Sequence, residues 1–188
     1  HGKGQTSRNN HTGRNKIYYC ITSENVRNTR KNRKPRGNLK MKTEKVKLKK
    51  LSSLAKVPVY SSECAAGADL YAATADGVTI APGDTVMIGT GIAAQIPDGL
   101  VGLVYARSGL ATKRGIAPAN KVGVIDSDYR GEIKVSLHNH SSEPQTIAAG
   151  ERIAQLVIAP YIRADFEECD NLDETGRGAG GFGSTGTK

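Results

Sequence analysis

The sequence predicts an all-β domain, a barrel or a sandwich with one short helix, and three observations support this. Short runs rich in Val, Ile and Leu recur at spacings of roughly 8 to 15 residues, with turn-forming residues between them. Apolar and polar residues alternate along 132–139, as in a strand with one buried face. Helical periodicity is confined to 108–115, where Gly115 would end the helix.

The predicted strands follow one another from Val57 to residue 162. Pairs such as Pro-Gly, Asp-Gly and Ala-Gly stand between the apolar runs and favour reversal of the chain. We expect KVGVI (121–125), as a buried strand, and EIKVSL (132–137) to form a β-hairpin around the turn DSDYRG. The other apolar runs are VTI (78–80), TVMIGTGIAAQI (85–96), LVGLVYA (100–106) and RIAQLVIAPYI (152–162).

Charge is distributed unevenly along the 188 residues. Residues 1–50 hold 16 Lys/Arg against 2 Asp/Glu, whereas residues 51–188 hold 11 against 16. A basic stretch without apolar periodicity is typical of a disordered segment. We therefore predict a disordered basic extension at 1–40, a barrel domain at 41–170 and a flexible C-terminal arm at 171–188.

The basic extension at 1–40 has two interpretations. Met41 opens MKTEKVKLKKLS, which resembles a natural start and favours upstream sequence as the origin of 1–40. Alternatively the extension contacts nucleic acid or, in a eukaryotic source, directs the chain to the nucleus or an organelle. The three cysteines lack C-x-x-C spacing, which favours a reducing, cytoplasmic location over a disulfide framework or a zinc site. No run of 18 apolar residues occurs, so no membrane-spanning helix is predicted.

The segment ARSGLATKRG (106–115) predicts an anion site. Arg107, Ser108 and Gly109 stand where the short helix would begin, and a guanidinium, a hydroxyl and free backbone N–H groups together favour anions. The alternative is an ordinary turn in which Ser108 caps the helix.

The segment NKVGVIDSDYRGE (120–132) contains a candidate general base. Gly123 within the strand indicates close approach of a ligand or of another backbone. Asp126 directly follows an apolar pair, which places it at the mouth of the barrel, where a carboxylate can orient a water. The alternative is that Asp126 and Asp128 only shape the turn.

Other polar residues in the predicted strands each have two possible interpretations. Asp69 is a turn former or an indirect metal partner, and Gln155 is a strand amide or a ligand donor. His138 and His140 lie on one face of a strand, either as a pair of metal ligands or, as we favour, as part of a solvated face.

Five segments together resemble the ordered motifs of the trimeric deoxyuridine triphosphatase (dUTPase) family. They are AGADLYA, ARSGLA, NKVGVIDSDYRGE, GERIAQL and RGAGGFGSTG, and the match extends from about Lys45 to the C-terminus. Any one motif is weak, whereas five in order are very specific. Ala106 departs from the Pro of many relatives, and 1–40 has no counterpart. The resemblance implies a jelly-roll or β-clip barrel with one short helix, assembled as a homotrimer with a C-terminal arm.

The resemblance further implies hydrolysis of dUTP to dUMP and pyrophosphate, which keeps uracil out of DNA and supplies dUMP for thymidylate synthesis. Mg²⁺ would be held mainly by the triphosphate, with Asp69 contacting a metal-bound water. Asp126 would activate the water that attacks the α-phosphorus. The phosphate-binding residues would be Arg107, Ser108, Gly109 and Gln155.

The same resemblance implies a uracil site on the 120–132 segment. The side chain of Asn120 and backbone groups of Gly123, Val124, Ile125 and Asp126 would meet the polar edge of the base. Tyr129 would pack under the deoxyribose and exclude a 2′-hydroxyl. The residue expected to contribute only its backbone is Lys134.

In the family, three subunits build each site, and the third chain's tail closes over it. Within the tail, Arg177 and the hydroxyls of Ser184 and Thr185 would bind the γ-phosphate. Phe182 would stack on uracil, and Gly183 would let backbone N–H groups approach the phosphates.

The sequence leaves two alternatives to dUTP hydrolysis. A deoxycytidine triphosphate deaminase shares the fold, but Phe182 in the tail and the IDSDYRG segment favour the triphosphatase. A nucleic-acid-binding or regulatory protein could use residues 1–40, although every expected catalytic position is occupied.

Overall fold

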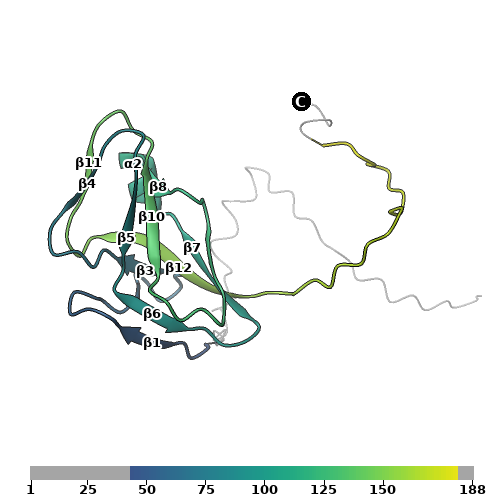
Figure 1. Cartoon of the computed structure of the whole chain (residues 1–188), viewed down its shortest axis with the longest axis horizontal. Helices are drawn as coiled ribbons and strands as arrows, with labels where there is room; N and C mark the ends of the chain where they lie inside the picture. Colours follow the sequence, from purple (N-terminus) through teal and green to yellow (C-terminus); the bar gives the residue numbers. More distant parts are fainter. Residues whose placement is uncertain (1–42, 182–188) are drawn as a thin grey trace, which may run out of the picture. The chain divides into compact units, whose positions relative to one another are not determined.

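A computed structural model describes residues 43–181 of the chain, and within this range twelve strands and one helix surround an aliphatic core (Figure 1). This confirms the predicted all-β fold with a short helix. The compact unit that contains these elements begins at Glu44. The predictions for 1–40 lie outside the described residues. The strands are β1 (Lys47–Lys50), β2 (Val59–Tyr60), β3 (Ala68–Tyr71), β4 (Val78–Ile80), β5 (Thr85–Gly89), β6 (Ile92–Gln95), β7 (Leu100–Tyr105), β8 (Ile116–Pro118), β9 (Gly123–Ile125), β10 (Lys134–Asn139), β11 (Gln145–Ile147) and β12 (Arg152–Pro160).

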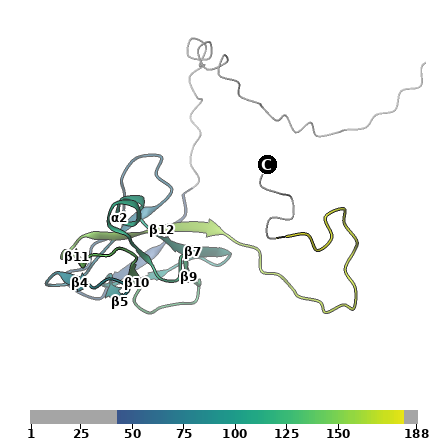
Figure 2. The ribbon, with the colours of Figure 1, turned by 90° about the horizontal axis from the view of Figure 1, so that it is seen from above.

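All strand pairs are antiparallel and form four sheets. The largest has the order β2-β3-β12-β7-β9, and a second has the order β5-β10-β8. Two further pairs join β1 to β6 and β4 to β11. The nine-residue β12 pairs with both β3 and β7. Figure 2 shows β12 crossing the domain beside β7 before the chain continues into the C-terminal segment. This strand therefore connects residues that are far apart in the sequence.

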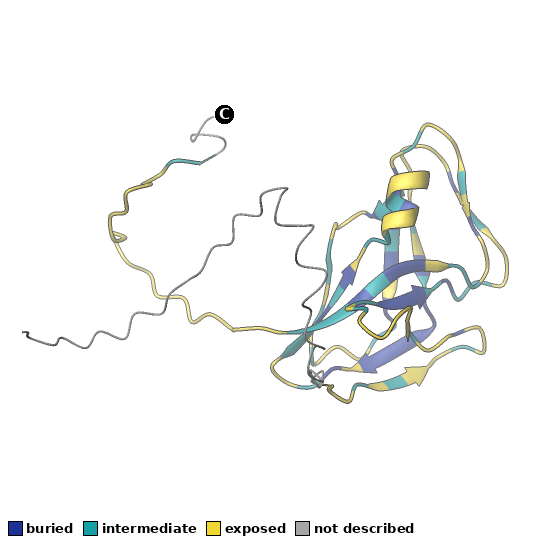
Figure 3. Ribbon diagram, turned by 180° about the vertical axis from the view of Figure 1, so that it is seen from behind, coloured by how far each residue is buried: buried dark blue, intermediate teal, exposed yellow. Residues whose placement is uncertain are grey.

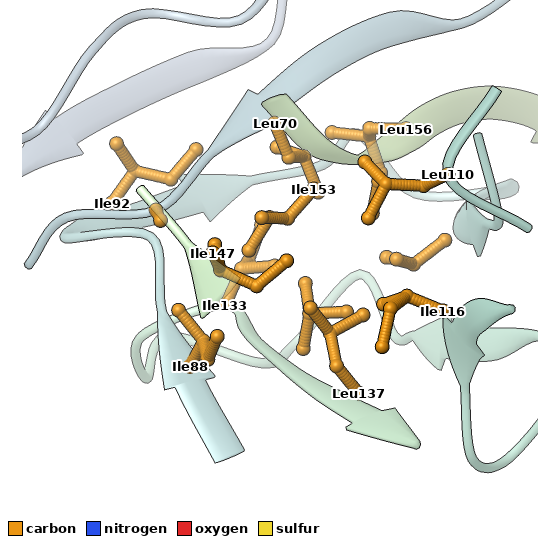
Figure 4. Close-up of a cluster of buried hydrophobic side chains, with 14 of the residues drawn as sticks. Leu70, Ile88, Ile92, Leu110, Ile116, Ile133, Leu137, Ile147, Ile153 and Leu156 are labelled. Atoms are coloured by element: carbon orange, nitrogen blue, oxygen red, sulfur yellow. The ribbon is translucent and has the colours of Figure 1, made fainter. Parts of the chain in front are cut away.

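The alternation predicted in 132–139 is present in β10. Ile133, Val135 and Leu137 are at most 2% exposed, whereas Lys134 is exposed. The inward side chains join a core made almost entirely of Ile, Leu, Val and Ala, shown in Figure 4. Burial of a Leu or Ile side chain contributes about 1.5 to 3 kcal/mol, so these strand faces supply most of the stability of the domain.

The predicted hairpin between 121–125 and 132–137 is wrong. β9 pairs with β7, whereas β10 pairs with β5 and β8, so the two segments lie in different sheets. The connection over 126–133 is longer than the loops of two to five residues that usually join paired strands. β9 is also not buried in the single chain, where Val124 is 62% exposed.

The predicted helix is α2, Ser108–Arg114, and Gly115 ends it in the left-handed conformation with φ of 66°. The N-cap is Arg107, and no side chain caps the helix. The alternative interpretation of Ser108 as a capping residue is therefore wrong, because Ser108 is the first helical residue.

The C-terminal segment leaves the barrel after β12. Tyr161 N–H still bonds to Gly99 O at 3.2 Å, and from there to Ala179 every residue is exposed (Figure 3). Ile162, Phe166 and Leu172 are 96%, 93% and 87% exposed in this single chain. Within residues 43–181, no helix is long and apolar enough to cross a membrane.

Candidate active site

A buried carboxylate lies between two arginines at one end of the five-stranded sheet. The side chain of Asp69 on β3 is 3% exposed, and its Oδ1 accepts a 2.9 Å hydrogen bond from Arg107 Nε. Its Oδ2 accepts a 3.2 Å bond from Arg152 Nη1. Two guanidinium groups thus offset the desolvation of one carboxylate, which otherwise costs several kcal/mol. Arg107 donates through Nε alone within 43–181, which leaves its terminal nitrogens available for an anion.

The first turn of α2 exposes backbone N–H groups beside Arg107. The first intrahelical bond runs from Ala111 N–H to the Arg107 carbonyl, so Ser108 and Gly109 have no partner for their N–H groups within the helix. A Cβ placed on Gly109 would have no atom within 4 Å, so open space lies above these groups. An anion held by Arg107 would have room to contact them.

Gln155 joins the same end of the sheet through β12. It pairs with Asp69 on β3 and with Tyr105 on β7, two residues before Arg107. A Cβ on Gly67 would lie 3.1 Å from Gln155 Cβ, so glycine leaves room for the amide side chain. The structure therefore brings five predicted residues together. We call these the anion cluster: Asp69, Arg107, Ser108, Gly109 and Gln155.

A second group of predicted residues lines a pocket of about 160 Å³ between β9 and β10, here called the strand-gap pocket. Gly123 allows β9 to approach its neighbours, because a Cβ there would lie 3.2 Å from Val104 Cβ and 3.4 Å from Asn120 Nδ2. The lining residues on the two sides are Asn120, Gly123, Val124 and Ile125, and Lys134, Val135 and Ser136.

Both strands present open backbone edges to the strand-gap pocket. β9 pairs along one edge only, with β7. β10 pairs with β5 from Lys134 onward but with β8 only from Leu137, and Ala119 N–H extends that pairing to Ser136 O at 2.8 Å. The edge at Lys134 and Val135 therefore stays unpaired in the described structure. Fixed N–H and C=O groups on two facing edges can recognise the polar rim of a flat ligand.

A wider pocket of about 360 Å³ contains Tyr129 and Asp126 beside residues of the strand-gap pocket. Tyr129 is 44% exposed, and its hydroxyl donates a 3.0 Å hydrogen bond to Glu132 O. Its ring is folded over Gly131, where a Cβ would lie 2.6 Å from the ring atom Cζ. The loop 126–133 thus holds an aromatic ring in a defined place at the wall of this pocket.

Glu132 anchors that loop and contacts Lys134. Its Oε1 accepts a 2.8 Å bond from Gly91 N–H, and its Oε2 lies 3.7 Å from Lys134 Nζ. The side chain of Lys134 is therefore paired with Glu132, while its backbone faces the strand-gap pocket.

Asp126 is exposed and directly follows β9. Its backbone oxygen accepts a 3.2 Å bond from Tyr129 N–H, so it does start the turn. Its carboxylate makes no hydrogen bond or ion pair within residues 43–181, which leaves it free to accept a proton from a water. The same side chain lines the 360 Å³ pocket and a neighbouring pocket of about 620 Å³.

The two groups lie at opposite ends of β7. Asp126 follows Ile125, which pairs with Gly102 near the start of β7, whereas Arg107 comes two residues after Tyr105, the last residue of that strand. Five to six residues at about 3.3 Å per residue separate the two levels by roughly 15 to 20 Å. The backbones of Asp126 and Arg107 are therefore well separated within one chain.

The described residues contain no group of three His, Cys, Asp or Glu that could hold a metal ion. The rings of His138 and His140 pack edge to face at 4.3 Å, and Thr85 Oγ1 lies 2.9 Å from His138 Nδ1. Desolvation, followed by the positive neighbours His138 and Lys121, lowers the pKa of His140. His138 is half-buried and His140 is exposed, and their assignment to a solvated face stays a prediction.

Arg177 is exposed, and its Nε donates a 2.6 Å bond to Gly180 O within its own segment. It does not contact the anion cluster in the single chain. The other predicted tail residues lie outside the described range: Phe182, Gly183, Ser184 and Thr185.

A model of the dUTPase family matches residues 54–186, which contain both groups of residues. The chain belongs to the dUTPase family. It is 50% identical over 145 residues to the deoxyuridine 5′-triphosphate nucleotidohydrolase of Hahella chejuensis, covering 77% of this chain and 95% of that protein. It is 55% identical over 132 residues to the protein of the same name from Desulfitobacterium hafniense, covering 70% and 87%.

The structure of this dUTPase-family chain also resembles solved ones. A mutant dUTPase of Staphylococcus bacteriophage 80alpha, solved with dUpNHpp, superposes with a TM-score of 0.67 at 28% identity. That match covers 77% of this chain and 99% of the phage protein. The predicted family and fold are therefore confirmed.

Sequence reasoning missed four residues of this dUTPase-family site. Arg152 holds Asp69, Glu132 anchors the Tyr129 loop, and Met87 and Val135 line the pockets. Arg152 and Glu132 lie inside two of the quoted motifs, and that position could have indicated them. Met87 lies outside all five motifs, so nothing in the sequence indicated it.

Proposed function

We propose that this chain hydrolyses dUTP, as its magnesium complex, to dUMP and pyrophosphate. The strongest single support is the strand-gap pocket, in which open edges of β9 and β10 adjoin the unpaired carboxylate of Asp126. The names of the curated relatives point to the same substrate. Removing dUTP would keep uracil out of DNA and supply dUMP for thymidylate synthesis.

Uracil binds in the strand-gap pocket in this proposal. Backbone groups of Gly123, Val124, Ile125 and Asp126, with the amide of Asn120, meet its two carbonyls and its N3–H. Cytosine presents an amino group where uracil presents a carbonyl, so its binding would bury unpaired groups at about 1 to 3 kcal/mol each. The residues that line the strand-gap pocket would pack closely against the base and exclude the methyl group of thymine.

Tyr129 supports the deoxyribose and selects against ribose. Its ring is held by the bond to Glu132 O and by contact with Gly131, so it cannot easily retreat from a 2′-hydroxyl. Substrate selectivity against UTP would then follow from packing alone.

The anion cluster binds the triphosphate. Arg107 and the free N–H groups of Ser108 and Gly109 bind phosphate oxygens, and Gln155 donates from the neighbouring strand. The two oxygens of Asp69 each accept one arginine bond, and a carboxylate has about four lone-pair sites. The remaining sites fit a contact with water bound to the Mg²⁺ that arrives with the triphosphate.

Asp126 orients the attacking water and accepts its proton. The new bond joins the water oxygen to the α-phosphorus, and the bond from that phosphorus to the bridging oxygen breaks in line. Pyrophosphate leaves with its charge bound by the anion cluster and Mg²⁺. Most of the acceleration would come from positioning and charge neutralisation, because an exposed carboxylate is a modest base.

A homotrimer would unite the two halves of the site. The strand-gap pocket and Asp126 of one chain would face the anion cluster of another, because roughly 15 to 20 Å separates them within one chain. The exposed apolar residues of the arm, Ile162, Phe166 and Leu172, support its packing on a neighbouring chain. Arg177, Phe182, Gly183, Ser184 and Thr185 would then close the site as a lid.

We also propose a cytoplasmic location. Cys64 and Cys169 are exposed free thiols in the described structure, which suits a reducing compartment.

The test is release of pyrophosphate from dUTP, dCTP, dTTP and UTP with Mg²⁺. We expect dUTP to exceed dCTP in kcat/KM by at least about a hundredfold, because mismatched polar groups would be buried. The preference over dTTP and UTP should be about ten- to a hundredfold, because packing rejects an added methyl or hydroxyl group less strongly. Ammonia release from dCTP would support the deaminase instead, and equal turnover of all four would exclude the proposed pocket.

A further inference from the structure

We infer that Arg114 and Glu151 are positioning residues for the triphosphate, because they fix the far end of the helix that begins at Arg107. The inference rests on the proposed function, since it concerns the binding of the same substrate. Neither residue belongs to the anion cluster or lines a pocket described above.

Arg114 is the last residue of α2 and binds three acceptors outside the helix. Its Nη1 donates a 2.7 Å bond to Glu151 Oε1, and its Nη2 donates a 2.6 Å bond to Thr146 O. Its Nε donates a 3.1 Å bond to Gln145 Oε1. Three bonds from one rigid guanidinium fix the rotation of the helix end as well as its distance from β11.

Glu151 is itself held in place. Its Oε2 accepts a 2.8 Å bond from Ala148 N–H, and its carbonyl accepts a 2.8 Å bond from Ala72 N–H. The side chain of Glu151 is 24% exposed and that of Arg114 is 30% exposed, so solvent only partly screens the pair. These two contacts hold Glu151 in place independently of Arg114, so Glu151 fixes the position of the Arg114 guanidinium.

The next residue holds the opposite end of the same helix. Arg152 bonds to Asp69, which bonds to the N-cap residue Arg107. The dipeptide Glu151–Arg152 therefore secures both ends of α2, one end through Arg114 and the other through Asp69. A change at Glu151 or Arg114 leaves the Asp69 contacts in place and releases one end only.

Helix α2 needs this support. It has seven residues, no side-chain cap and one buried residue, Leu110. Helices this short are not stable on their own in water, so external contacts determine their orientation. If the Arg114 end moves, Ser108 and Gly109 change the direction of their N–H groups toward the phosphates.

The strand-gap pocket shares no residue with this pair. It lies between β9 and β10, whereas Arg114 and its partners lie on α2, β11 and the loop before β12. Loss of the pair should therefore weaken binding of the triphosphate and spare binding of the nucleoside. A merely structural role would weaken both ligands equally.

The experiment measures calorimetric Kd values of dUpNHpp with Mg²⁺ and of deoxyuridine for the full chain, three variants of the pair and one control variant. For Arg114→Ala we expect dUpNHpp affinity to fall about tenfold and deoxyuridine affinity to stay within about twofold; a tenfold change equals about 1.4 kcal/mol. Arg114→Lys keeps the positive charge but loses the planar guanidinium with its several donors, so its affinities should resemble those of Arg114→Ala. Glu151→Gln keeps one acceptor oxygen and replaces the other with an NH2 donor, so it can accept from Arg114 or from Ala148 N–H but not from both. Its affinity for dUpNHpp should fall between those of the wild type and Arg114→Ala.

Lys113→Ala is the matched control, since it removes the same charge from the adjacent exposed position. Lys113 makes no hydrogen bond or ion pair within residues 43–181, so both affinities should match the wild type. Wild-type dUpNHpp affinity in Arg114→Lys and Glu151→Gln, or an equal loss for both ligands, would overturn the inference, and these two variants decide it if Arg114→Ala does not fold. A wild-type chain that leaves dUTP intact would instead overturn the proposed function.

Discussion

Asp126 and Asp69 are both carboxylates of the proposed site, and their surroundings give them different roles. Asp69 is 2% exposed and each of its oxygens accepts a bond from an arginine, so its role is to position cationic groups. Asp126 is exposed and unpaired within the described range, so it can accept the proton of a water. This contrast supports Asp126, which directly follows an apolar pair in the sequence, as the proposed base.

Asp126→Asn should lower kcat for dUTP by a factor of about 10² to 10⁴, the usual contribution of a general base. The Kd of dUpNHpp should change little, because the amide keeps the size of the side chain and Asp126 binds the ligand mainly through its backbone. Single-turnover kinetics and calorimetry measure the two quantities. A variant with turnover near that of the wild type would exclude Asp126 as the base.

At the scale of elements, the separation of β9 from β10 creates the strand-gap pocket. Paired strands would have satisfied their own backbone groups and left nothing to recognise a base. The loop 126–133 keeps the two strands apart, and it places Tyr129 over Gly131 beside the gap. The loop conformation thus determines both the base site and the sugar site.

Gly131→Ala should disturb the sugar site without touching the substrate directly. The new Cβ would lie 2.6 Å from the ring atom Cζ of Tyr129, so the ring must move. We expect KM for dUTP to rise and the ratio of kcat/KM for dUTP over UTP to fall by about tenfold, equivalent to about 1.4 kcal/mol of lost discrimination. Steady-state kinetics with both nucleotides measure this ratio. An unchanged ratio would show that Tyr129 does not select the sugar.

The sequence predicts which face of a strand is buried better than it predicts which strand lies beside it. Alternation in 132–139 correctly placed Val135 and Leu137 in the core, because burial of a strand face has a period of two. The predicted hairpin failed, because alternation carries no information on which strand lies alongside. The bond between Asp69 and Arg152 joins residues 83 positions apart, so spacing could not have indicated it. Five ordered motifs were needed to bring such distant residues into one prediction.

At the scale of the whole molecule, the described part of the chain carries the expected groups at separate places. Asp126 and Arg107 lie at opposite ends of β7, and Arg177 bonds only within the arm. Three copies arranged around an axis would supply three complete sites from the same parts. The central claim is therefore that hydrolysis of dUTP takes place between chains.

The most direct test mixes two inactive proteins, Asp126→Asn and a chain truncated before Arg177. After joint unfolding and refolding, mixed trimers contain sites with Asp126 from the truncated chain and the tail from the other. We predict that the mixture regains pyrophosphate release from dUTP, while each protein refolded alone stays inactive. A mixture as inactive as its components, although native mass spectrometry detects mixed oligomers, would contradict a site shared between chains.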